Sequence, residues 1–227
     1  MATPTTTTDP KHAVIIGAGP GLGASIARRF GREGFAITLV ARNEQALSEL
    51  ADELRATGVK VDTATADAAD TAGFRTALEE IAGRITPGVV VYNAALVASD
   101  SVLSNDVEYF ATAYAVDVLG AISAAQVFTP AMRQAGAGTF LATGGYASVS
   151  PHPAYATLGL GKAALRNAVS MLHDELKPEG VHAAGVTICG PIAPGTPIDP
   201  DGIADTYWNL HTQPAEQWTA ETNFDGK

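Results

Sequence analysis

The sequence is poor in cysteine and in basic charge, and each shortage excludes a class of protein. Cys189 is the one cysteine among 227 residues, so neither an intrachain disulfide nor a cysteine-rich zinc site can form. Fourteen basic residues against 24 acidic ones give a net charge of −10, which argues against a general binder of nucleic acid. No uninterrupted apolar run approaches roughly 18 residues, and residues 1–12 lack the features of a secretory signal. We therefore expect a cytoplasmic protein that binds neither nucleic acid nor a membrane.

The rest of the composition is that of a folded domain. Hydrophobic residues make up 46% of the chain and charged residues 17%, which excludes a disordered chain, a coiled coil and a collagen-like repeat. At roughly 150 residues per domain, a chain of this length fits one α/β domain better than two. Residues 1–10 are rich in threonine and proline and predict a disordered tail. The remaining residues, 11–227, are then a single domain.

Short apolar runs alternate with segments of helical periodicity. The runs predict buried strands over 14–16, 36–40, 59–66, 88–92, 139–142 and 181–188. Helices are predicted over 22–30, 43–56 with Asn43 as the cap, 71–81, 106–134 and 153–176, and a last short helix over 203–210 precedes an edge strand at 219–224. This order predicts an α/β fold of the doubly wound, Rossmann type, with a parallel sheet whose ligands bind at the carboxyl ends of the strands.

A glycine-rich turn joins the first predicted strand to the first predicted helix. Free N–H groups and the helix dipole favour a phosphate at such a helix N-terminus, and glycines let the backbone approach it. The predicted contacts of a dinucleotide in this turn are Gly17, Gly19, Gly21, Leu22 and Gly23.

The end of the second strand bears on the choice of dinucleotide. An NAD site would place an acid there to bind the ribose 2′-hydroxyl, but Ala41 and Arg42 follow Val40. An arginine with no acid beside it favours a 2′-phosphate, so NADP is predicted over NAD. Asp67 and Asn93, which end the third and fourth strands at the same edge, are further predicted cofactor contacts.

Together these segments resemble the short-chain dehydrogenase/reductase family over about residues 11–196. Its glycine motif is matched by Gly17, Gly21 and Gly23, its acid after the third strand by Asp67, and its Asn-Asn-Ala-Gly segment in part by residues 92–95. The resemblance implies an NAD(P)-dependent oxidoreductase of a small-molecule substrate. It also implies a cofactor contact near Ile192, a substrate loop at about 191–212 and a homodimer or homotetramer.

The active site of that family is altered in this chain. The resemblance makes Lys162 the lysine that holds the nicotinamide ribose, but Leu158 stands at the tyrosine position, Gly145 at the serine and Asp117 at the asparagine. Tyr155 precedes Lys162 by seven residues, a spacing similar to that of the divergent enoyl-acyl-carrier-protein reductase branch. Seven helical residues turn about 700°, so the two side chains could share one helix face.

Tyr155 is therefore predicted to donate the proton or to hold the developing negative charge on an oxygen, with Lys162 as the nearby cation that assists it. Asp117 is predicted to relay protons or to pair with Lys162, and Tyr146, which resembles another tyrosine of the same branch, to contact substrate. The predicted reaction is NADP-dependent hydride transfer to a small carbonyl or activated alkene. Two alternatives stay open: an NADP-binding sensor or regulator without chemistry, and a dehydratase or cyclase that uses the same pocket.

Two further expectations concern the long helices and the C-terminal segment. Small residues occur on several faces of helices 106–134 and 153–176, which the resemblance makes the dimer interface, and Ala124 and Ala164 are candidate contacts. Three residues that follow the proline-rich loop are expected to shape a substrate pocket: Tyr207, Trp208 and His211.

Overall fold

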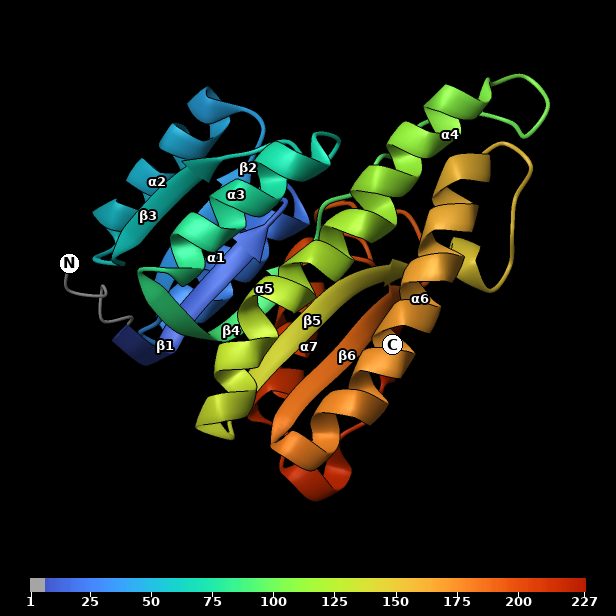
Figure 1. The fold of residues 1–227 in the computed structure, drawn as a ribbon. Coiled ribbons are helices and arrows are strands. Elements are labelled where there is room, and N and C mark those ends of the chain that lie inside the picture. The colour runs from blue at the N-terminus through green and yellow to red at the C-terminus, as the bar shows by residue number, and fades with distance from the viewer. Residues whose placement is uncertain (1–6) are drawn as a thin grey trace.

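The computed structural model describes residues 7–227, which form a seven-stranded parallel β-sheet flanked by helices (Figure 1). The strands lie in the order β3-β2-β1-β4-β5-β6-β7. Successive strands are placed to one side of β1 as far as β3 and to its other side from β4 onward. The boundary between β1 and β4 is therefore the switch point at which such sheets bind ligands. The strands are β1 (Thr7–Ile16), β2 (Ala36–Ala41), β3 (Val61–Thr65), β4 (Ile85–Tyr92), β5 (Gly138–Gly145), β6 (Val181–Ile188) and β7 (Glu221–Phe224).

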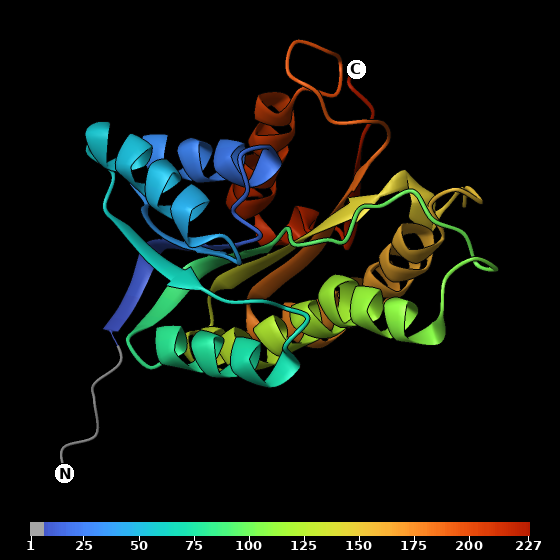
Figure 2. The ribbon, with the colours of Figure 1, turned by 90° about the horizontal axis from the view of Figure 1, so that it is seen from above.

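Helices cover both faces of the sheet (Figure 2). One face carries α1 (Leu22–Arg32), α2 (Glu44–Ala56) and α7 (Pro200–Thr212). The other carries α3 (Thr71–Ala82), α4 (Val107–Tyr114), α5 (Gly120–Ala135) and α6 (Ala156–Leu176). A π-helical turn, Ala115–Leu119, joins α4 to α5, and 3₁₀ turns cover Tyr146–Ser148, Lys177–Glu179 and Ala215–Gln217. The predicted fold class, a doubly wound parallel sheet, is confirmed.

Alternate side chains of each strand build a separate core on each face. Ile15 of β1 joins the core that contains Phe30 and Leu47, on the side of α1 and α2. Its neighbour Val14 points the opposite way and joins the core that contains Phe128 of α5. Such burial on both faces explains why these strands are continuous apolar runs and not alternating ones.

The predicted disordered tail extends too far. Residues 7–9 already belong to β1 and pair in register with residues 85–87 of β4. The register shifts between Asp9 and Ala13, and this irregularity accommodates Pro10, which has no N–H for the ladder. Threonine is a good strand former, but the threonine- and proline-rich composition of residues 1–10 led to the prediction of a disordered tail. Residues 1–6 of the predicted tail lie outside the described residues.

The long helix predicted over 106–134 is present, interrupted by the π-helical turn. By length and composition alone, the stretch Val107–Ala135 could cross a membrane. Polar residues interrupt this stretch, so it does not count as an uninterrupted apolar run. Half of its most apolar window is buried inside the protein, where Phe128 and Met132 pack against the sheet. A core helix of a soluble protein passes the same test, so this helix is weak support for a membrane span.

The helix predicted over 203–210 is present and longer than predicted. It is α7, residues 200–212, because Asp199 caps a helix whose first residue is Pro200, and it takes up the second half of the segment 191–212 assigned to the substrate loop. Tyr207 is fully buried, and the rings of Trp208 and His211 pack on Phe30. These three residues therefore build the core between α7 and α1 and do not line a substrate pocket.

The small residues of α5 also have a different role from the predicted one. They face the sheet, where they allow the helix to approach it closely, and Ala124 is fully buried there. Ala124 therefore cannot contact a second subunit, whereas Ala164 of α6 is half-buried. Larger apolar side chains are exposed on this layer instead, among them Tyr114, Leu119 and Met171.

Candidate active site

Two close approaches of the main chain shape the glycine turn after β1. Gly17 has a φ of 85°, and a Cβ on it would lie 2.4 Å from the backbone nitrogen of Ala94. A Cβ on Gly23 would lie 2.4 Å from the carbonyl oxygen of Gly17, so neither position tolerates a side chain. Gly19 and Gly21 face open space instead, and Gly21 caps α1 without a side chain. The absence of side chains at Gly19 and Gly21 leaves space for a phosphate to approach the N-terminus of α1, and the turn fits a dinucleotide.

A cleft of about 310 Å³ lies beside this turn, at the carboxyl ends of β1 to β4. The predicted cofactor contacts that line it are Gly17, Gly19, Arg42, Asp67 and Asn93. Leu22 points into the core, and Ile192 lies 41% exposed in the loop after β6; neither is among the lining residues. Gly21, Gly23 and Lys162 do not line it either, so five of the ten predicted cofactor contacts line the cleft and five do not.

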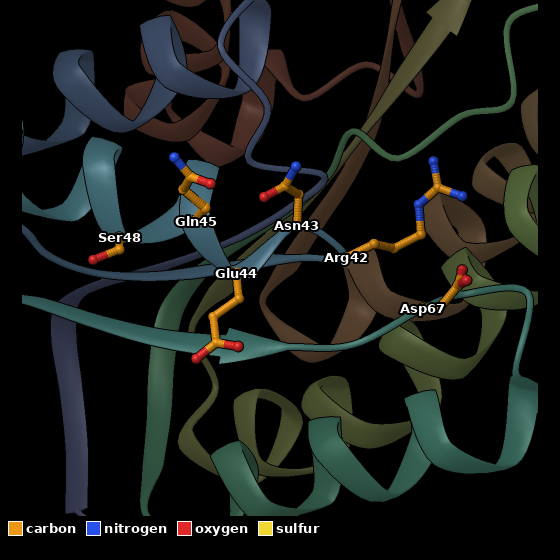
Figure 3. Close-up of a pocket in the computed structure, with 6 residues that line it drawn as sticks. All are labelled: Arg42, Asn43, Glu44, Gln45, Ser48 and Asp67. Carbon is orange, nitrogen blue, oxygen red and sulfur yellow. The ribbon is translucent and has the colours of Figure 1, made fainter.

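The Arg42 end of the cleft widens into an open depression (Figure 3). Arg42, Asn43, Gln45 and Ser48 bring N–H and O–H donors to it, from the end of β2 and the start of α2. The side chain of Arg42 extends toward Asp67, while Glu44 points in another direction. Asp67 also accepts a hydrogen bond from the amide of Ala69 at 3.0 Å, which holds the turn after β3.

Asn93 ties the glycine turn to the neighbouring strands. Its amide nitrogen donates to the carbonyl of Gly17 at 2.9 Å, and its main-chain N–H donates to the carbonyl of Ile16 at 2.7 Å. Its amide oxygen accepts from the hydroxyl of Thr143, on β5, at 2.8 Å. Asn93 thus lines the cleft and also fixes the turn against β4 and β5.

Lys162 is buried on α6, directly behind the end of β5. Its ammonium group donates to the carbonyl of Thr143 at 2.6 Å, and its side chain is 4% exposed. A Cβ on Gly145 would lie 3.7 Å from Cγ of Lys162, so the residue at the family's serine position is next to the lysine. Burial lowers the pKa of Lys162, and the negative charge of Asp117 opposes this shift.

Asp117 enters the same region from the π-helical turn. One carboxylate oxygen accepts from the amide of Leu96 at 2.8 Å, and the other has no hydrogen-bond partner in the described part of the chain. A Cβ on Gly161 would lie 2.6 Å from the second oxygen, so a glycine beside Lys162 makes room for the carboxylate. Burial raises the pKa of Asp117 to about 6 against the opposing effects of Lys162 and the Leu96 amide.

The π-helical turn that carries Asp117 is supported from β4. The hydroxyl of Tyr92 donates to the carbonyl of Val116 inside the turn, and both residues are buried. Burial raises the pKa of Tyr92, and the charge of Asp117 adds to this effect. π-helical turns often mark functional sites, because the extra residue re-aims a side chain.

The two predicted tyrosines lie at the exposed margin of the site. Tyr155 is 42% exposed, with its ring centroid 5.7 Å from that of His152. The prediction that it shares a helix face with Lys162 is wrong, because α6 begins after Tyr155. Asp100 accepts hydrogen bonds from the amide and the hydroxyl of Thr157 and so fixes this helix start.

Tyr146 immediately follows Gly145 and begins the 3₁₀ turn over β5, with 51% of its surface exposed. Leu158, at the position of the family's tyrosine, lies in the first turn of α6 and is half-buried. The chemical roles of Tyr146 and Tyr155 stay predictions.

These features can be compared with known proteins. The family model of short chain dehydrogenases matches residues 11–200, which include the glycine turn, Asn93, Asp117 and Lys162. The chain belongs to this family. It is therefore an NAD(P)-dependent oxidoreductase, and enzymes of this family act on small-molecule substrates.

Relatives and solved structures agree with this assignment. An uncharacterised oxidoreductase of Staphylococcus epidermidis is 27% identical over 214 residues, which cover 90% of this short-chain dehydrogenase and 92% of the relative. A very-long-chain 3-oxoacyl-CoA reductase of Neurospora crassa is 33% identical over 175 residues, 74% of this chain but 52% of that enzyme. The crystal structure of a metagenomic short-chain oxidoreductase in complex with NADP has a TM-score of 0.84 and 25% identity, and the match covers 95% of this chain and 96% of that one. The dehydrogenase thus spans about half of the Neurospora enzyme.

The sequence analysis did not identify three residues of this site, and it gave a fourth, Tyr207, a different role. Thr143 directly follows the predicted strand 139–142 and lies near the carboxyl end of β5, so the rule that identified Asp67 and Asn93 could have found it. Gly161 and Tyr92 gain their roles only through contact with the π-helical turn. Tyr207 bonds to Thr143 across 64 positions of sequence, and no local pattern signals that contact.

Proposed function

We propose that this short-chain dehydrogenase uses NADP(H) and reduces a small carbonyl compound or an activated alkene. The observation that carries the proposal is the cleft that extends from Arg42 past the glycine turn to Asn93. It has the position and the backbone geometry that a dinucleotide requires. When bound, the nicotinamide supplies the hydride.

The preference for NADP rests on the Arg42 end of the cleft. Arg42, Asn43 and Ser48 offer hydrogen-bond donors in an open depression, where a 2′-phosphate can be solvated and bound at once. The carboxylate of Glu44 points away from Arg42, whereas that of Asp67 lies on the side toward which Arg42 extends (Figure 3). The NADP in the metagenomic relative supports the same choice.

The chain itself has to supply a proton and stabilise charge on the substrate oxygen. Lys162 provides a buried positive charge, and the Asp117 carboxylate favours its charged form. Tyr155 is the proposed proton donor, at the start of the helix that carries Lys162, and Tyr146 the proposed substrate contact. Asp117 is the proposed proton relay behind the lysine. The name of the Neurospora relative supports a carbonyl over an alkene as the reduced group.

Turnover with a substrate panel tests the proposal. Purified protein with NADPH should lose absorbance at the nicotinamide band when aldehydes, ketones or enones are added, and NADH should support slower turnover. Lys162→Met, which keeps a long apolar stem but removes the charge, should abolish the reaction. Binding of neither dinucleotide by the wild-type protein would contradict the proposal.

A second function is favoured by the missing hydroxyls. Gly145 and Leu158 stand where the family has a serine and a tyrosine, and neither can donate a proton. A protein that binds NADPH tightly and reduces no member of a broad panel is better explained as an NADP-dependent sensor or regulator. A dehydratase or cyclase would instead convert substrate without consuming NADPH.

We also propose a homodimer or homotetramer. The exposed apolar side chains of Tyr114, Leu119 and Met171 lie on the layer formed by α4, α5 and α6. Large apolar side chains at the surface of such a layer favour contact with another subunit.

A further inference from the structure

Thr143 connects three parts of the site through one residue. Its hydroxyl lies 2.8 Å from the amide oxygen of Asn93 and 2.6 Å from the hydroxyl of Tyr207, on α7. Its main-chain carbonyl accepts the ammonium of Lys162 at 2.6 Å. Thr143 is 7% exposed and Tyr207 is fully buried, so the bond between their hydroxyls is shielded from water.

The direction of every hydrogen bond in this network follows from its ends. The carbonyl of Gly17 can only accept, so the Asn93 amide must turn its nitrogen toward it. The amide oxygen then faces Thr143 and can only accept, which makes the Thr143 hydroxyl the donor. Since that hydroxyl has one hydrogen, Tyr207 must donate to Thr143. The chain of donors therefore has a single orientation, from α7 to the glycine turn.

We propose that Thr143 and Tyr207 are positioning residues of the cofactor site, which make the C-terminal helix α7 a part of it. The Tyr207 hydroxyl fixes the rotamer of Thr143, Thr143 fixes the amide of Asn93, and Asn93 holds the Gly17 carbonyl beside the cleft. The Thr143 carbonyl also sets the position of Lys162. This inference rests on the proposed binding of NADP(H).

Thr143→Val is the direct test, because valine keeps the shape of threonine and removes the hydroxyl. The Asn93 amide oxygen then loses its donor inside the protein, and we expect the Kd for NADPH to rise about tenfold. Thr143→Ser keeps the hydroxyl and should restore nearly wild-type affinity. Tyr207→Phe keeps the ring and leaves the Thr143 rotamer less restrained, so its Kd should rise about threefold.

The matched control uses the same helix and strand farther from the cleft. Thr139, four residues earlier on β5, bonds to His211, one turn later on α7, at 2.9 Å. Thr139→Val removes a comparable bond between β5 and α7, so it should lower the melting temperature much as Thr143→Val does. It should leave the Kd for NADPH unchanged.

Titration calorimetry with NADPH, at a temperature where melting curves show each variant folded, gives the readout. A raised Kd in Thr143→Val and Tyr207→Phe, but not in Thr143→Ser or Thr139→Val, supports the positioning role. Equal Kd values in wild type and Tyr207→Phe would overturn it even if Thr143→Val does not fold, and so would an equal rise in the Thr139→Val control. A wild-type protein that binds no dinucleotide would overturn the proposed function, and this inference with it.

Discussion

Replacing Asp117 by asparagine should stabilise the protein at neutral pH. The Asp117 side chain is fully buried, and one of its carboxylate oxygens has no hydrogen-bond partner among the described residues. Burial raises its pKa from 3.8 to about 6, although Lys162 and the Leu96 amide both lower it. Asparagine has nearly the same shape, so the change mainly removes the charge. Well above pH 6 the buried charge costs about 3 kcal/mol, because each pKa unit corresponds to about 1.4 kcal/mol.

The pH dependence gives the sign of the effect. Between the unfolded pKa and the raised folded pKa the native state binds more protons, so wild-type stability falls as pH rises through this window. The asparagine variant lacks this loss. Its advantage should be about 3 kcal/mol at pH 8 and about half of that at pH 5, and it should nearly vanish below about pH 3.

Urea denaturation of both proteins at pH 8, 6.5 and 5 measures this difference. Asp62→Asn, at an exposed position on β3, is the control and should change stability by less than about 0.5 kcal/mol. An asparagine variant that is less stable than wild type at pH 8 would show that attraction to Lys162 outweighs burial. An advantage that does not shrink toward pH 5 would refute the assigned cause.

Further expectations concern the cofactor, the chemistry and the assembly. Wild-type protein should bind NADPH at least about tenfold more tightly than NADH, which corresponds to about 1.4 kcal/mol. Calorimetry should show that Arg42→Ala removes most of this preference. Equal affinities of the wild-type protein for the two dinucleotides would contradict the prediction. Tyr155→Phe should lower kcat by about 10²–10³-fold with little change in NADPH affinity, and unchanged turnover would show that another group supplies the proton. Sedimentation should show a dimer or tetramer at micromolar concentration; Leu119→Glu should weaken it without unfolding the protein, and a wild-type monomer would refute the interface.

Local periodicity was sufficient to predict most of the fold. Leu22, Ile26 and Phe30 recur at helical spacing and are all buried on α1, and β6 occupies the residues predicted for it. Asn43 caps α2 as predicted, since its side chain accepts the amide of Ala46. These features depend on neighbours in sequence. The strand character of residues 7–9 depends on β4, about 80 residues later, and was therefore missed.

The site divides in the same way. Asp67 and Asn93 were found because parallel strands end at one edge, and that rule needs only the strand assignments. The environment of Asp117 could not be predicted, because it depends on the π-helical turn. This turn inserts one residue into a helix whose periodicity looks regular in the sequence. The placement of Tyr155 failed because Asp100, 57 positions before Thr157, decides where α6 begins. Helix ends set by distant side chains are not encoded in local spacing.

Lys162 is the residue that argues most strongly for a retained ligand site. Its ammonium group has three hydrogens, and within the described residues the Thr143 carbonyl is its one hydrogen-bond acceptor. Burial lowers its pKa, which means that the folded protein loses stability by keeping the charge there. A leucine at this position would bury no charge and would not lower the stability in this way. The adjacent Gly161 is required because Asp117 approaches it closely. The contact with the ribose of a dinucleotide that the family resemblance implies for Lys162 would supply hydroxyl acceptors to this buried cation.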